Sequence, residues 1–110
     1  MKLPNADRAF VSPEKLAGYS LDSDHPGGKH KARVFESALG LTRDDAPWLR
    51  DRILDAILTA EATEKEPTEF GRRYVVHFPL ATETGTAILR TAWIVRYDEP
   101  FPRLTSCYIP

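Results

Sequence analysis

Residues 24–35, DHPGGKHKARVF, hold the side chains best suited to chemistry. A proline and two glycines precede Lys29, His30 and Lys31, and an apolar helical pattern then begins. A helix N-terminus presents free N–H groups and a partial positive charge, so cations are unfavourable there unless an anion binds. Glycine also lets the backbone approach a phosphate closely. We therefore expect Gly28, Lys29 and Lys31 to contact a phosphate.

Two histidines flank these glycines, His25 and His30. Imidazole titrates near neutral pH, so either side chain could act as a general acid or base. Against a functional site, Asp22 and Asp24 could neutralise the lysines, or the lysines could simply extend into solvent. The third histidine, His77, lies in an apolar strand pattern, and HxxxxH is not a standard ligand spacing, so no metal site is predicted.

Three further candidates lie in predicted strands, Arg90, Thr105 and Tyr108. We expect Arg90 on the apolar face that the helices cover, where an unpaired guanidinium is very costly. It would then pair with Glu36 or Asp55, or else line a cleft that takes an anion. Thr105 and Tyr108 could position a phosphate or a 2′-hydroxyl, although their high β-propensity also suits ordinary strand residues.

The segments LPNADRA, HPGGKHKARVF, RYVVHFPL, RTAWIV and RLTSCYIP together resemble an uncharacterised bacterial domain family. Its members often read HPxGxHKAxxF at the position of His25 to Phe35. More loosely, the order of elements is similar to that of toxin ribonucleases of the barnase–EndoU–colicin–RelE fold group. That resemblance implies N-terminal helices before a four-stranded antiparallel sheet, and RNA cleavage without a metal or cofactor.

The leading hypothesis is a metal-independent endoribonuclease, acting as a bacterial toxin domain on RNA. RNA supplies its own nucleophile, the 2′-hydroxyl, so the enzyme only moves protons and stabilises charge. Gly28, Lys29, Lys31 and Arg90 would bind the phosphate. The candidate catalytic residues are His30, His25, Lys31, Arg90, Tyr108 and Thr105.

The partners under this hypothesis are RNA and an antitoxin or immunity protein. The alternative is a non-enzymatic protein-binding or immunity-type module. It fits the formal net charge of −1 and the lack of a recognised catalytic signature. A protein held to nucleic acid by charge alone would be far more basic, so any RNA contact must be local.

Helical patterns come first along the chain. Residues 13–19 follow a Ser12 cap, residues 29–39 end before Gly40, and a third helix begins at a Thr42 or Asp45 cap and runs to about residue 62. Alternating patterns then predict consecutive strands. The expected strands are 63–69, 72–80, 87–97 and 103–109, with a short one at 8–11. Helices followed by strands indicate an α+β fold, with the helices on one face of an antiparallel sheet of about four strands.

Strand parity sorts the side chains between the two sheet faces. With a hairpin loop of about three residues after the strand 72–80, the covered face holds the even-numbered residues of each strand. These are Tyr74, Val76, Phe78, Leu80, Ile88, Arg90, Ala92, Ile94, Leu104, Ser106 and Tyr108. Val75, His77, Thr91, Trp93, Thr105 and Cys107 would face the other way. A slip of one residue would move a whole strand to the opposite face.

The chain of 110 residues is expected to form one domain. A single cysteine excludes an internal disulfide, and no apolar run approaches the 18 residues of a membrane span. The N-terminus MKLPNADRAF lacks the apolar region of a signal peptide. We therefore expect a cytoplasmic protein, or a module exported within a longer toxin chain, with no membrane partner.

Overall fold

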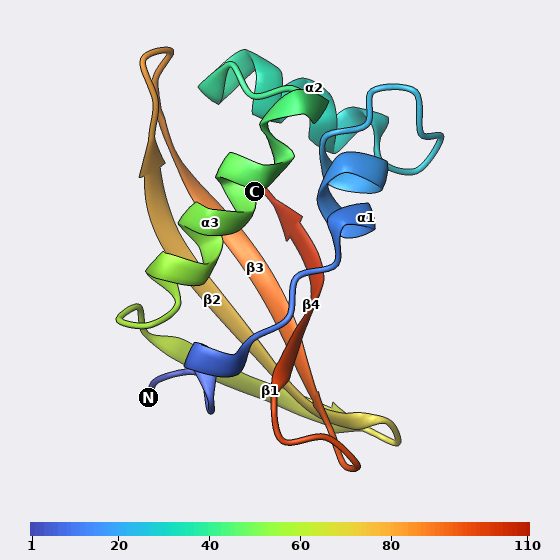
Figure 1. Ribbon diagram of the computed structural model, residues 1–110, viewed down its shortest axis with the longest axis vertical. Coiled ribbons are helices and arrows are strands. Elements are labelled where there is room, and N and C mark those ends of the chain that lie inside the picture. Colours follow the sequence, from blue (N-terminus) through green and yellow to red (C-terminus); the bar gives the residue numbers. More distant parts are fainter.

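The computed structural model describes residues 1–110 and has helices in the N-terminal half followed by a four-stranded antiparallel sheet. The strands lie in sequence order, β1-β2-β3-β4, and the helices lie over one face of the sheet (Figure 1). The predicted α+β class is thereby confirmed. The bounds are α1 Pro13–Lys15, α2 Lys29–Leu39, α3 Ala46–Ala56, β1 Ala62–Thr68, β2 Gly71–Ala81, β3 Thr86–Arg96 and β4 Pro102–Tyr108.

The first two helices form where the sequence predicts them. Pro13 occupies the first helical position of α1, and a π-helical turn, Leu16–Ser20, continues that segment. Helix α2 ends at Gly40, whose φ of 68° lies in the left-handed region that favours glycine. The Leu41 amide then donates to the Phe35 carbonyl at 3.2 Å, which satisfies an otherwise free carbonyl at the helix end.

Helix α3 begins as predicted but ends earlier. Thr42 and Asp45 form a capping box, with the Thr42 amide donating to Asp45 Oδ2 at 2.8 Å. The expected end near residue 62 is wrong, since the regular helix stops at Ala56. Ala62 is already a buried strand residue opposite Val76, and its amide donates to the Met1 carbonyl at 2.7 Å. Pairing with β2 therefore determines the structure here, although the helical spacing of apolar residues continues beyond Ala56.

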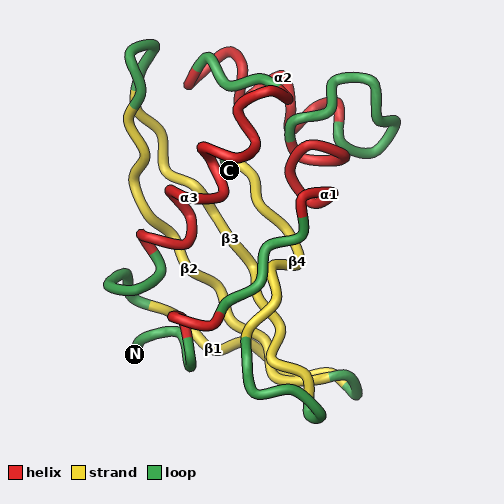
Figure 2. Tube along the Cα trace, viewed as in Figure 1, coloured by secondary structure: helices red, strands yellow, loops and turns green.

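The predicted strand over residues 8–11 is also wrong. Ala6–Arg8 forms a 3-10 helix, and only Phe10 pairs with the sheet, in an isolated parallel bridge to Arg103. The Phe10 amide donates to the Pro102 carbonyl at 2.9 Å, and the Leu104 amide donates to the Phe10 carbonyl at 3.0 Å. This contact covers the outer edge of β4 over its first half (Figure 2).

The predicted sorting of side chains between the sheet faces fails on β3 and most of β4. Ala81 pairs with Thr86, so the hairpin loop holds four residues instead of three, and the parity of β3 is reversed. Leu89, Thr91 and Trp93 therefore join β2's Tyr74, Val76 and Phe78 on the covered face, with Leu104 and Cys107 from β4. The open face instead carries Arg90, Ala92, Ile94, Ser106 and Tyr108, beside Val75 and His77.

The core contains one polar network, which the sequence did not indicate. The Thr91 hydroxyl donates to the Val76 carbonyl at 2.8 Å and accepts a hydrogen bond from Trp93 Nε1 at 2.9 Å. Both side chains are buried, and no buried side-chain polar atom lacks a partner. Trp93 is thus a core residue and has no face available for a ligand.

The tip of the β2–β3 hairpin packs against the C-terminal end of α2 (Figure 1). The Thr82 hydroxyl donates to the Leu39 carbonyl at 2.7 Å, and a Cβ at Gly85 would lie 2.8 Å from the Ala38 carbonyl oxygen. The hairpin therefore holds one end of α2. No helix is both long and apolar enough to cross a bilayer.

Candidate functional site

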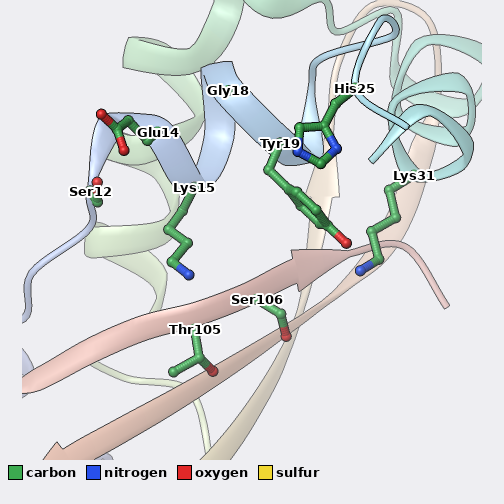
Figure 3. A pocket seen from close by; sticks show the side chains of 9 residues that line it. All are labelled: Ser12, Glu14, Lys15, Gly18, Tyr19, His25, Lys31, Thr105 and Ser106. Atoms are coloured by element: carbon green, nitrogen blue, oxygen red, sulfur yellow. The ribbon is translucent and has the colours of Figure 1, made fainter. Parts of the chain in front are cut away.

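A cavity of about 490 Å³ lies between the first helical segment, the start of α2 and the edge strand β4 (Figure 3). Only one of its nine lining residues is hydrophobic. The lining residues are Ser12, Glu14, Lys15, Gly18, Tyr19, His25, Lys31, Thr105 and Ser106. Elements far apart in sequence thus place basic and hydroxyl side chains around one hollow.

Two lysines enter this cavity from different elements. Lys15 and Lys31 extend toward β4 on either side of Tyr19, while the carboxylate of Glu14 points away from both (Figure 3). None of the five ion pairs of the structure includes either lysine. Lys31 Nζ lies 4.9 Å from the centroid of the Tyr19 ring. The cavity therefore contains two positive charges with no carboxylate paired to them.

His25 is held in one orientation by the backbone that follows it. Its Nδ1 accepts hydrogen bonds from the Gly27 amide at 2.9 Å and the Gly28 amide at 3.1 Å. Its ring packs edge-on against Tyr19, with centroids 4.8 Å apart. Because Nδ1 accepts these bonds, the proton of the neutral ring is on Nε2. His25 therefore offers a ligand an N–H donor.

Gly28 has a packing role at the start of α2. A Cβ at this position would lie 2.2 Å from the Tyr19 carbonyl oxygen, so only glycine fits. The Gly28 amide already donates within the loop, as does the Lys29 amide, which reaches the His25 carbonyl at 2.9 Å. The glycine thus brings α2, with Lys31, against the helical segment that carries Tyr19.

The floor of the cavity is a β-bulge in β4. Ala92 pairs with Ser106 and Trp93 pairs with Leu104, which leaves Thr105 as the extra residue. Bulges redirect side chains and occur often at sheet edges and beside active sites. The Ser20 hydroxyl, which is buried, donates to the Cys107 carbonyl at 2.7 Å and anchors the helical segment to this half of β4.

The structure brings together some of the predicted site residues but not others. Lys31, His25 and Thr105 line the cavity, whereas His30 is exposed and outside it and Lys29 does not line it. The residues that the sequence reasoning missed are Lys15, Tyr19, Ser12, Glu14, Gly18 and Ser106. The spacing of Lys15 and Tyr19, four residues apart in a predicted helix, places them on one face and could have indicated the pair.

The expected position of Arg90 on the covered face is wrong, because the longer hairpin loop turns it to the open face beside His77. It forms no ion pair with Glu36 or Asp55. Arg90 Cζ instead lies 5.6 Å from the centroid of the Tyr108 ring, and Lys31 Nζ lies 5.2 Å from the same centroid. Arg90 and Tyr108 therefore extend the basic surface from the cavity onto the open face.

Cys107 lies beside the cavity but is not part of its chemistry. Burial raises the pKa of its thiol to about 12, although the nearby Lys31 charge acts in the opposite direction. The side chain stays a protonated thiol at neutral pH and packs in the core. No group of three or more His, Cys, Asp or Glu side chains is arranged to hold a metal ion.

The comparisons with known proteins give a family without an assigned function. No curated protein matches the chain. One family model, described as a domain of unknown function (DUF6883), matches residues 2–110. Because this match covers nearly the whole sequence, the chain belongs to the DUF6883 family.

Proposed function

We propose that the chain is a metal-independent endoribonuclease of the toxin type, which cleaves RNA through the 2′-hydroxyl. The observation that carries this proposal is the convergence of Lys15 and Lys31, neither paired with a carboxylate, on hydroxyl groups at the edge of β4. A site with uncompensated positive charge and several donors is suited to an oxyanion.

A phosphodiester matches these donors in charge and geometry. Its two non-bridging oxygens accept hydrogen bonds, and the cavity offers them two ammonium groups, the Nε2–H of His25 and the hydroxyls of Thr105 and Ser106. Such groups stabilise a phosphorane most strongly, because negative charge on its oxygens increases in the transition state. Arg90 lies farther along the open face, where it would contact a neighbouring phosphate of the strand.

Cleavage requires two proton transfers. The 2′-oxygen attacks phosphorus and loses its proton, the bond from phosphorus to the 5′-oxygen breaks, and that oxygen gains a proton. The first proton passes to solvent water in the open cavity, while the Tyr19 hydroxyl, beside the Lys31 ammonium, donates a hydrogen bond to the phosphorane. A lysine ammonium supplies the second proton. His25, with Nδ1 occupied, binds a phosphate oxygen. The products carry a 2′,3′-cyclic phosphate and a 5′-hydroxyl.

The test is RNA cleavage by the purified chain in the presence of a strong chelator, with product ends identified by mass spectrometry. Wild-type protein should produce cyclic phosphate ends, and Lys31→Met should lose activity. Lys65→Met is the matched control, since Lys65 is an exposed lysine on β1 with no ion pair. Absence of cleavage by wild-type protein, or full activity of a Lys15→Met/Lys31→Met double variant, would overturn the proposal.

One observation favours the alternative, a non-enzymatic protein-binding or immunity-type module. The open sheet face presents Ile88, which is 48% exposed, near Arg90 and His77, and such a mixed apolar and basic surface suits a protein partner. Expression in a bacterial host separates the two functions. A nuclease arrests growth and its Lys31→Met variant does not, whereas a binding module leaves growth unchanged in both forms.

A further inference from the structure

A second cavity, of about 580 Å³, lies at the far end of the sheet and shares a lining residue with the first. Its lining includes two aromatic side chains, Phe70 and Tyr97, together with Ile94, Arg96 and Thr105. Thr105, the bulge residue of β4, also lines the lysine cavity. The two hollows therefore adjoin each other at a single side chain.

Phe70 and Tyr97 are brought together because the backbone of the β1–β2 turn lies close to the end of β3. Gly71 pairs with Arg96, and a Cβ on Gly71 would lie 2.3 Å from the Val95 carbonyl oxygen. Only glycine allows the β1–β2 turn to lie this close to the end of β3. Phe70 directly precedes Gly71 at the turn, and Tyr97 directly follows Arg96 at the end of β3, so the two residues lie near each other.

Thr68 holds both aromatic residues in place. The Phe70 amide donates to Thr68 Oγ1 at 3.2 Å, and the Tyr97 hydroxyl donates to the Thr68 carbonyl at 3.2 Å. The rings nevertheless stay open to solvent, with Phe70 67% and Tyr97 65% exposed. Thr68 thus holds the Tyr97 hydroxyl and the Phe70 backbone, and neither ring is buried in the core.

The charges around the second cavity differ from those around the first. Two carboxylates, Glu69 and Asp98, line it and would repel a phosphate group. They can instead accept hydrogen bonds from N–H groups of an uncharged ligand. An exposed aromatic surface stacks on planar rings, and every nucleobase has such a face.

We propose that this second cavity binds the nucleobase of a nucleotide adjacent to the phosphate held by Lys15 and Lys31. This inference rests on the proposed ribonuclease function and names the substrate feature that the same site reads. Phe70 and Tyr97 stack on the base, and the carboxylates accept hydrogen bonds from the exocyclic amino groups of adenine, cytosine or guanine, whereas uracil offers them only its N3–H group. Thr105 lies where the base and phosphate positions meet.

The experiment uses 2′-deoxy dinucleotides, which cannot be cleaved through a 2′-hydroxyl, and measures their dissociation constants by calorimetry. One set carries adenine, cytosine, guanine or uracil, and one dinucleotide is abasic at the same position. Phe70→Leu and Tyr97→Leu should each weaken binding of the amino-bearing bases roughly 5- to 100-fold, the range for loss of one base–aromatic stack. Binding of the abasic dinucleotide should not change. Trp48→Leu, at an exposed aromatic residue on α3, is the matched control.

Each other result has a distinct meaning. Equal binding of abasic and base-containing dinucleotides, or no effect of either aromatic variant, overturns the base site while leaving the lysine cavity and RNA cleavage intact. Base-dependent binding that Phe70→Leu removes, in a protein that cleaves no RNA, supports the base site and overturns only the ribonuclease. If none of the dinucleotides binds, the base site is also overturned.

Discussion

The two halves of strand β4 differ in whether the cations beside them are paired with a carboxylate. In the first half, Arg103 donates from Nε and Nη2 to the two carboxylate oxygens of Glu99, each at 2.7 Å. Its guanidinium also lies 5.1 Å from the ring centroids of both Phe10 and Phe101. In the second half, Lys15 and Lys31 approach the strand without any carboxylate partner.

This difference separates cations that hold the fold from cations available to a ligand. The first half of β4 is closed by backbone pairing to Phe10, and its charge is satisfied within the protein. The second half is bulged at Thr105 and is anchored by a single side chain, Ser20. Lys15 and Lys31, unlike Arg103, have no ion-pair partner within the protein and so are available to the phosphate that we propose binds there.

The largest predicted effect is a contrast between two variants that each remove one cation, one in each half of β4. Lys31→Met is expected to lower RNA cleavage about 10²- to 10³-fold, as for loss of one transition-state donor, with little change in the midpoint of thermal unfolding. Arg103→Met should do the reverse and lower the unfolding midpoint while cleavage stays near wild type. Rates and melting curves measured on both variants make the comparison. Equal losses of activity in the two would show that the halves do not differ.

A second prediction concerns the contact that places Lys31. Gly28→Ala puts a methyl group against the Tyr19 carbonyl oxygen and should destabilise the fold by about 1–3 kcal/mol, as in other overpacked sites. The shift of α2 should also reduce cleavage further than the stability loss explains. Denaturant unfolding measures the first effect. Gly18→Ala is the control for stability, since a Cβ there meets only an ordinary contact at 3.7 Å, and equal destabilisation of that variant would contradict the packing role of Gly28.

A smaller loss is expected at the anchor of the second half. Ser20→Ala removes the buried hydrogen bond to the Cys107 carbonyl, and loss of one such bond typically costs about 0.5–1.5 kcal/mol. Chemical denaturation gives the value, and the exposed Ser23→Ala serves as the control. Stability equal to wild type would mean that the helical segment does not depend on this anchor.

The smallest effect should be a dependence of stability on acid pH. The hydrogen bond to Arg103 lowers the pKa of Glu99, and the N-terminal ammonium and Lys2 lower the pKa of Glu61 to about 2. Because both carboxyls bind protons less readily when folded, their contribution is present above the unfolded value of 4.5 and is lost as the pH falls toward 2.

Both carboxyl groups are near the surface, so salt should screen the acid effect. Unfolding curves between pH 5 and about 2, at low and high salt, measure it. Glu99→Gln and Glu61→Gln should flatten the dependence. A pH profile in these variants that matches wild type would assign the acid effect to other groups.

The sequence predicted the elements well and the contacts between them less well. Helix α2 and its Gly40 end follow from local periodicity and turn chemistry, so they could be read directly. The four-residue loop before Thr86 could not, and this one extra residue moved Arg90 to the open face and Trp93 into the core. Register depends on loop geometry and on packing across the sheet, neither of which is encoded in a short segment.

The candidate site shows the same limit. The stretch HPGGKHK contains His25 and Lys31, which the structure places in one cavity, but also Lys29 and His30, which do not line it. Lys15 lies 16 residues earlier and Ser106 lies 75 residues later than Lys31, and only tertiary packing brings them together. The bulge at Thr105 likewise has no signal in the local sequence.

The contact between Thr82 and the end of α2 has a consequence for how the chain can tolerate change. An 11-residue helix is a rigid rod of about 16 Å, fastened at one end to the hairpin tip and at the other, by Gly28, to Tyr19. An insertion or an affinity tag in residues 82–85 would therefore tilt this rod and displace an ammonium group at its opposite end. The tip of the β2–β3 hairpin is therefore an unsuitable site for inserting a tag or a peptide into the protein.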